Sequence, residues 1–152
     1  MIRPDVRNNT RVMVDRIDWA RELWELVRPV APPPMNGLAP SGLNERFRFY
    51  RYDPGQRFAG HMDMGYCRPD ASEMSLVTLM IYLNDDFEGG ATRFFEHRLQ
   101  VTPEAGMGLF FVHEQLHEGS EVTRGRKYVL RTDVMYRSAS DLSSRGAASG
   151  PR

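Results

Sequence analysis

Two side chains that can bind a metal ion stand two residues apart, at His61 and Asp63. In a β-strand, residues at this spacing point to the same face, so the imidazole and the carboxylate would converge on one point. A third ligand from a distant strand would complete a set of two histidines and one carboxylate, which is typical of mononuclear non-haem iron(II) sites with open coordination positions. His117 is our candidate for this third ligand. The spacing alone is weak support, because a histidine close to an aspartate is more often an ordinary polar pair.

The chain contains four histidines and one cysteine, so few other residues compete for this metal site. His113 lies four residues before His117, and we place it near a turn at the rim of the site, with a role toward the substrate. His97 is expected in a hairpin, in contact with solvent. Cys67 is expected in the loop after Asp63 and is predicted to be inert.

Two cations are expected to face the interior of the fold from the last apolar segment, 127–136. The alternation of side chains along a strand puts Lys127, Arg131 and Asp133 on the same side. A buried cation is costly unless an anion accompanies it, so this face needs either acidic neighbours or anionic ligands. Asp133 is a candidate to neutralise one of the two cations. Arg131 has the better bidentate geometry for binding a carboxylate.

Short strands must position these residues. From residue 45 onward, runs of β-branched, aromatic and leucine residues alternate with turn-forming segments. The pattern predicts strands at about 47–53, 57–63, 75–83, 91–95, 98–102, 107–112, 116–122 and 127–136. In strand 75–83, Val77 and Leu79 lie on an apolar face, whereas Thr78 and Tyr82 would point into the mouth of a barrel. The fold class is therefore mainly β, a closed or sandwiched antiparallel sheet.

The segments at the two ends complete the expected domain. Apolar residues at helical spacing predict one amphipathic helix over about 15–27, which would cover the apolar face of the sheet. The stretch 29–42 contains five prolines and two glycines and is predicted to be a connector. We expect one domain over 1–137, with its barrel at 45–137, and a disordered tail at 138–152 that is rich in serine, alanine and glycine.

Composition narrows the expected partners. Lys plus Arg and Asp plus Glu both number 20, so no net charge attracts nucleic acid or an anionic membrane. The single cysteine excludes an internal disulfide and favours a reducing, cytoplasmic location. No apolar run approaches the length of a membrane span, and the N-terminal residues do not resemble a signal peptide. The sequence leaves the oligomeric state open.

Several motifs, in order along the chain, strengthen the prediction of a metal site. The segment 51–58, Arg-Tyr-Asp-Pro-Gly-Gln-Arg-Phe, leads to His61 and Asp63, and 78–85 is followed by Glu-Gly-Gly-Ala-Thr at 88–92. His117 begins the segment 117–122, and Lys127 follows it ten residues later. From about residue 6 to residue 137, the chain resembles the prolyl 4-hydroxylase-like branch of the 2-oxoglutarate/Fe(II)-dependent oxygenase superfamily.

The resemblance implies a double-stranded β-helix, or jelly roll, that binds Fe(II), 2-oxoglutarate and O2, with ascorbate as an optional reductant. It implies that His61, Asp63 and His117 hold the metal. It also implies that Lys127 binds the distal carboxylate of 2-oxoglutarate together with Tyr82, and that Tyr52 lies near the metal-chelating end. Thr92, in the second motif, is a further candidate contact with the co-substrate. Arg131 remains both an alternative anchor and a candidate contact for a substrate carboxylate.

The implied activity is hydroxylation of an unactivated carbon in a peptidyl residue, a free amino acid or a small metabolite, with release of succinate and CO2. Asp63 favours this outcome, because halogenating relatives typically have a small residue at this position. Two other classes stay open: a non-catalytic jelly-roll module that binds metal, and a cupin-like metal-dependent hydrolase or isomerase. The presence of Tyr82 and Lys127 argues against both.

Overall fold

The computed structural model describes residues 6–140 of the 152-residue chain. In chain order, its helices and strands are β1 (Thr10–Asp15), α1 (Ile17–Val27), the 3-10 helix η1 (Arg28–Val30), β2 (Leu38–Leu43), β3 (Arg46–Tyr52), β4 (Phe58–His61), β5 (Met74–Tyr82), β6 (Glu88–Gly89), β7 (Thr92–Phe94), β8 (Leu99–Val101), β9 (Gly108–Val112), β10 (His117–Gly119), β11 (Val122–Arg124) and β12 (Lys127–Ser138).

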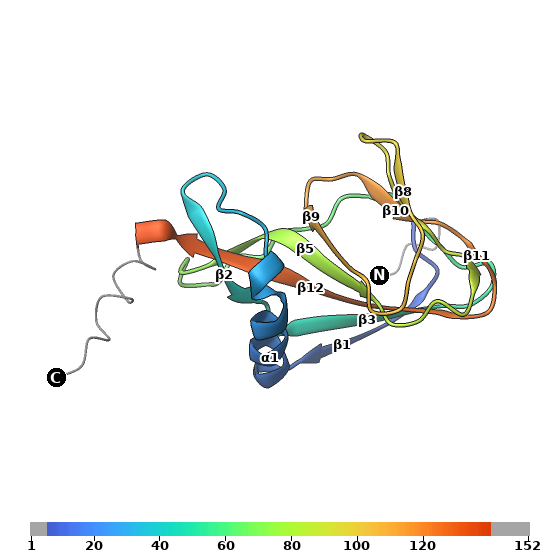
Figure 1. Cartoon of the computed structure of the whole chain (residues 1–152), viewed down its shortest axis with the longest axis horizontal. Coiled ribbons are helices and arrows are strands. Elements are labelled where there is room, and N and C mark those ends of the chain that lie inside the picture. Colours follow the sequence, from blue (N-terminus) through green and yellow to red (C-terminus); the bar gives the residue numbers. More distant parts are fainter. Residues whose placement is uncertain (1–5, 141–152) are drawn as a thin grey trace.

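Two antiparallel sheets build the domain (Figure 1). The main sheet has the strand order β1-β3-β12-β5-β9, and β2 pairs with β12 beside this path. The smaller sheet has the order β4-β10-β7-β8, and β11 pairs with β6 in a separate ribbon. In Figure 1, β8 and β10 lie on one side of the long strands and α1 lies on the other. This arrangement confirms the predicted mainly β jelly roll with a supporting helix.

The two faces of the main sheet have different neighbours, as the alternation of side chains predicts. Phe47, Val77, Leu79 and Val134 form one core cluster with Ala20 of α1. The opposite face contributes a second cluster, made of Tyr50, Tyr52, Tyr82, Val122 and Val129. The sheet therefore buries an apolar layer under the helix and turns Tyr50, Tyr52 and Tyr82 toward the interior of the barrel.

Helix α1 agrees closely with the predicted helix at 15–27. It begins at Ile17 because Asp15 still belongs to β1 and Arg16 has an extended backbone. Ala20 is buried, and Trp24 and Val27 pack against the same cluster. Helix α1 has 11 residues, and no helix among residues 6–140 is long and apolar enough to cross a membrane.

The structure corrects the expected connector at 29–42 and the expected N-terminal limit of the barrel. Strand β2 lies within the proline-rich stretch and pairs with the end of β12, where Pro40 stands opposite Tyr136 next to a register shift. Proline is tolerated there because β2 pairs with β12 alone. Strand β1 adds a second unpredicted strand, paired with β3 at the edge of the main sheet. The barrel therefore receives strands from before residue 45.

Three further boundaries differ from the prediction. The expected strand 116–122 is divided into β10 and β11, and the short strand β6 was not predicted. Strand β12 continues to Ser138, so the expected disordered tail does not begin at 138. The remainder of that predicted tail, 141–152, lies outside the described residues.

Candidate metal centre

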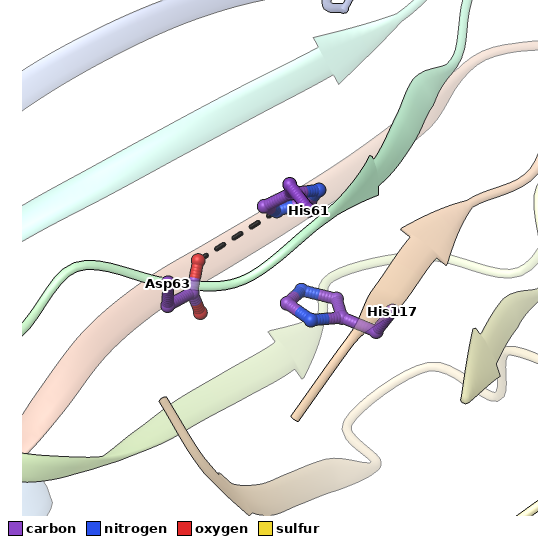
Figure 2. Close-up of side chains that lie close together, drawn as sticks. All are labelled: His61, Asp63 and His117. Carbon is purple, nitrogen blue, oxygen red and sulfur yellow. Dashed lines mark ion pairs between the residues drawn. The ribbon is translucent and has the colours of Figure 1, made fainter. Parts of the chain in front are cut away.

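His61, Asp63 and His117 lie together between the two sheets (Figure 2). His61 ends β4 and pairs in register with His117, the first residue of β10. Asp63 follows β4, and its backbone N–H donates to the carbonyl of His113 at 2.9 Å. One potential ligand atom from each of the three residues lies within 4.8 Å of the others. This donor set, two imidazoles and one carboxylate, fits a single ion such as Fe(II) and leaves further coordination positions open.

The expectation that Asp63 belongs to the same strand as His61 is wrong. Strand β4 ends at His61, so alternation within a strand does not place the carboxylate. The backbone hydrogen bond to His113 fixes the main chain at Asp63 instead. Asp63 Oδ1 lies 3.6 Å from Nε2 of His61, so the two side chains still converge.

Backbone carbonyls orient both histidine rings. Nδ1 of His61 donates to the carbonyl of Ala59 at 2.8 Å, and Nδ1 of His117 donates to the carbonyl of Gln115 at 2.9 Å. Because a carbonyl only accepts hydrogen bonds, each neutral ring carries its proton on Nδ1 and presents an unprotonated Nε2. Burial lowers the pKa of His117, which favours the neutral form that binds metal. Such outer hydrogen bonds are typical of metal-binding histidines.

Aromatic rings restrain the same two imidazoles. Phe58 stacks on His61 with a ring-centre distance of 3.6 Å and an angle of 10°. Phe111 meets His117 edge to face at 4.6 Å. These contacts limit rotation of the imidazoles and form apolar walls for the pocket that the three candidate ligands line.

Asp63 is held as a carboxylate. Its side chain is 4% exposed, and it accepts a hydrogen bond of 2.6 Å from the Thr78 hydroxyl. Arg131 Nη1 lies 3.1 Å from Oδ1. Burial alone would raise the pKa of Asp63, but the charge of Arg131 and the hydrogen bond from the Thr78 hydroxyl hold that pKa below its usual range. The ionised form that a metal ligand requires is therefore the stable one at neutral pH.

Lys127 is a buried cation in the same pocket. It is 2% exposed, its Nζ donates to the carbonyl of Gly90 at 2.6 Å, and it lies 4.9 Å and 5.4 Å from the ring centres of Tyr52 and Tyr82. Burial lowers its pKa from 10.5 to about 8. Within residues 6–140, no carboxylate pairs with Lys127. The pocket thus contains a desolvated positive charge that an anionic ligand would stabilise.

The other candidate contacts of the co-substrate surround Lys127. Tyr82 is fully buried, and its hydroxyl shares a hydrogen bond of 2.5 Å with Thr92. Burial raises the pKa of Tyr82 to about 12 and also raises the pKa of Tyr52, so both phenols are neutral hydrogen-bonding groups. Tyr52 and Thr92 line the same pocket as the three candidate metal ligands.

Arg131 also lines this pocket, but its charge is already matched. Its Nη1 contacts Asp63, and its Nη2 lies 3.2 Å from Asp133. Asp133 is completely buried and also lies 3.4 Å from Arg48. The expectation that Asp133 neutralises one inward cation is therefore confirmed, and the cation that it neutralises is Arg131. Of the two inward cations, Lys127 is the one without an acidic partner in the described chain.

The remaining candidates lie outside the cluster. His97 is exposed, as expected, and Cys67 is exposed as well. The prediction that His113 lies at the rim is wrong: it is 5% exposed, and burial lowers its pKa. The alternation of strand 107–112 contained the missing signal, because continuing it puts residue 113 on the same face as Phe111, which contacts His117.

The family described as the 2OG-Fe(II) oxygenase superfamily matches residues 47–132. A curated relative, "Probable prolyl 4-hydroxylase 9" of Arabidopsis thaliana, is 29% identical over 119 residues. This match covers 60% of the chain and 41% of the relative, so the chain spans about two fifths of that protein's length.

Solved structures show the same fold. The viral collagen prolyl hydroxylase from Paramecium Bursaria Chlorella virus-1, in complex with 2OG, is 23% identical, with a TM-score of 0.59 over 87% of this chain and 80% of that chain. A prolyl-4-hydroxylase of Pseudomonas putida is 21% identical, with a TM-score of 0.62 over 87% and 73%. A prolyl hydroxylase of Trichoplax adhaerens, in complex with a hypoxia inducible factor peptide fragment, is 15% identical, with a TM-score of 0.64 over 95% and 68%.

The family match extends over more than half of the 152 residues and includes all three candidate metal ligands and Lys127. The fold brings these four residues into one pocket. The chain therefore belongs to the 2OG-Fe(II) oxygenase superfamily.

Proposed function

We propose that this chain is a 2-oxoglutarate-dependent Fe(II) dioxygenase that hydroxylates an unactivated carbon of a peptidyl residue, with release of succinate and CO2. One observation carries the proposal most directly. The candidate ligands His61, Asp63 and His117 share a pocket with Lys127, a buried cation that has no acidic partner in the described chain. A metal site beside an unmatched buried cation suits a co-substrate that chelates iron at one end and carries a carboxylate at the other.

Each residue has a defined task in this proposal. His61 and His117 present Nε2, and Asp63 presents a carboxylate oxygen, to the metal. Lys127 binds the distal carboxylate of 2-oxoglutarate, assisted by the hydroxyls of Tyr82 and Thr92, with Tyr52 close by. When bound, iron and 2-oxoglutarate supply the oxidation: the keto acid is decarboxylated to succinate, and one oxygen atom of O2 enters the substrate C–H bond.

The charge pairing around Arg131 supports a peptidyl substrate over a free amino acid. Recognition of a free amino acid requires a cation for its carboxylate, and Arg131 is already paired with Asp63 and Asp133. The curated relative is named as a probable prolyl 4-hydroxylase, and one structural relative was solved with a peptide fragment. A prolyl residue within a peptide is therefore the first substrate to test.

The proposal includes a cytoplasmic location, which the single, exposed thiol of Cys67 supports. Neutral net charge supports a protein that does not bind nucleic acid or membrane surfaces.

Anaerobic titration of Fe(II)-loaded protein with 2-oxoglutarate tests the co-substrate assignment, through the visible absorption band of a keto acid chelated to iron(II). Oxygen is then admitted with a proline-containing peptide, with and without ascorbate, and succinate and the mass gain of the peptide are measured. We expect the band in the wild type, its loss in His117→Ala, and equal amounts of succinate and hydroxylated peptide. Iron binding without succinate would indicate a binding module, and activity that needs zinc or manganese but no keto acid would indicate a cupin-like hydrolase or isomerase.

A further inference from the structure

A continuous path of hydrogen bonds leads from Asp63 away from the candidate metal site. The Thr78 hydroxyl donates to Asp63 Oδ2 at 2.6 Å and also lies 3.0 Å from Nδ1 of His113. On the other side of the ring, Nε2 of His113 lies 2.9 Å from the hydroxyl of Ser75. The backbone N–H of Tyr66 donates to this same hydroxyl at 2.8 Å. Thr78, His113 and Ser75 are all buried, so the protein itself must satisfy these groups.

The direction of each hydrogen bond follows from its chemistry. An ionised Asp63 can only accept, so the single hydroxyl hydrogen of Thr78 points to Oδ2. The Thr78 oxygen must then accept from His113, which places the ring proton on Nδ1. Nε2 of that neutral ring has a free lone pair and accepts from the Ser75 hydroxyl. Because Ser75 in turn accepts from Tyr66, every hydrogen on the path has one position.

The main chain reinforces the same connection. The carbonyl of His113 accepts the backbone N–H of Asp63 at 2.9 Å, and the backbone N–H of His113 donates to the carbonyl of Leu76 at 3.0 Å. His113 therefore holds Asp63 twice, directly through its carbonyl and indirectly through its ring and Thr78. Thr78 engages Oδ2, whereas Oδ1 lies 3.6 Å from Nε2 of His61 and 3.1 Å from Nη1 of Arg131.

We propose that His113 is a positioning residue for the metal carboxylate: its ring, neutral and protonated on Nδ1, directs the Thr78 hydroxyl to Asp63 Oδ2 and so turns Oδ1, which Arg131 also contacts, toward the metal. This inference rests on the proposed function, because it takes Asp63 to be a metal ligand. The buried Thr78 oxygen would lose its donor without His113, and its hydroxyl would no longer be restricted to one orientation. Loss of an outer hydrogen-bond partner typically weakens metal binding by about 10- to 100-fold.

Amide substitutions separate the two ring nitrogens. In His113→Asn, the side-chain NH2 can replace Nδ1 and donate to Thr78, whereas in His113→Gln the longer amide reaches toward the position of Nε2 beside Ser75. The dissociation constant of Fe(II) is measured anaerobically by competition with a chromogenic chelator, without co-substrate. We expect His113→Asn to stay within about threefold of the wild type and His113→Gln to bind roughly tenfold more weakly or worse. Equal affinities for the two variants, or weaker binding by His113→Asn, would overturn the proposal.

A double-mutant cycle tests whether His113 acts through Thr78. Thr78→Val removes the hydroxyl at nearly constant shape, and His113→Leu removes both ring nitrogens. We expect each change alone to weaken Fe(II) binding by at least about tenfold, and we expect His113→Leu to add little in the Thr78→Val background. Additive effects would reject the relay. Should His113→Leu fail to fold, the cycle is run with His113→Gln instead.

Two controls separate this proposal from the proposed function and from general destabilisation. His97→Leu alters an exposed histidine outside the site and should leave the Fe(II) constant unchanged. Unfolding of each metal-free variant by urea reports any loss of stability independently of metal. A wild type that binds no Fe(II) would reject the proposed function together with this inference, whereas unchanged Fe(II) affinity in every His113 variant would reject this inference alone.

Discussion

Replacement of Lys127 by methionine should separate binding of the co-substrate from binding of the metal. Methionine is unbranched and flexible, so it can fill much of the volume of the lysine stem without its charge. Lys127 is 2% exposed, and its ammonium group donates to the carbonyl of Gly90. The change therefore removes a desolvated cation while largely preserving the packing against Tyr52 and Tyr82.

The expected loss of affinity for 2-oxoglutarate follows from the free energy that one charge-assisted hydrogen bond contributes. Such a contact contributes about 1.5 to 3 kcal/mol. Because each 1.4 kcal/mol corresponds to a factor of about ten, Lys127→Met should weaken 2-oxoglutarate by roughly 10- to 100-fold. Lys127→Arg keeps the charge but changes its reach, so it should lose less affinity. The Fe(II) constant should not change in either variant, because Lys127 contacts none of the candidate metal ligands in the structure.

The same substitution should change the pH dependence of stability. The folded pKa of Lys127, about 8, is below its ordinary value of 10.5. Between these values the unfolded chain binds more protons than the folded chain, so the free energy of unfolding of the metal-free wild type should rise with pH. Below about pH 8 both states are charged, and the full burial cost, about 3 kcal/mol at 1.36 kcal/mol per pH unit, is present. Lys127→Met lacks this cost and should be more stable there.

The measurements are anaerobic titration of 2-oxoglutarate at saturating Fe(II), and urea unfolding of the metal-free protein at pH 7 and pH 9.5. We expect the wild type to gain stability at the higher pH and the methionine variant to lack this gain. Wild-type affinity for 2-oxoglutarate in Lys127→Met would refute the reasoning. So would loss of that affinity in Arg131→Met alone, since the anchoring role would then belong to Arg131.

Three other outcomes are expected. Alanine at His61, Asp63 or His117 should abolish stoichiometric Fe(II) binding, measured by metal analysis. The control variant His97→Ala should retain this binding. Gly90→Ala should lower the free energy of unfolding, measured in urea, more than Gly37→Ala does. Both glycines have positive φ, which costs an alanine about 1 to 2 kcal/mol. Of these two positions, only Gly90 would place the new Cβ 2.9 Å from a neighbouring atom. Arg131→Met should cost about 3 to 5 kcal/mol of unfolding free energy, because it breaks a buried ion pair, and the exposed pair of Arg46 provides a control with a much smaller loss.

The orientation of side chains could be predicted from the sequence because a strand has a period of two residues. In β5, this period correctly assigns Val77 and Leu79 to the layer under α1 and Tyr82 to the interior of the barrel. In β12, it correctly brings Lys127 and Arg131 to the pocket. Such predictions succeed because both faces of the main sheet are buried and each face has a distinct set of neighbours.

The missed strands depend on pairing between distant segments rather than on local pattern. Strand β2 contains Pro40 and two small polar or flexible residues, and it exists because the end of β12 offers backbone partners. Strand β1 is mostly exposed and has no clear apolar face, but it pairs along its full length with β3. Asp63 is a similar case, since its partner is the backbone of His113, fifty residues later in the chain.

The different surroundings of the two inward cations show which property of a site can be determined only from the structure. Alternation gives Lys127 and Arg131 the same orientation, but the function of a buried cation depends on which anions lie within a few ångströms. Arg131 lies between Asp63 and Asp133, so it stabilises a carboxylate that the protein already contains. Lys127 lies between two phenol rings and a carbonyl, which are weaker partners than a carboxylate. The pocket therefore favours a ligand carboxylate at Lys127, while Arg131 and Thr78 hold the carboxylate of Asp63 against the metal.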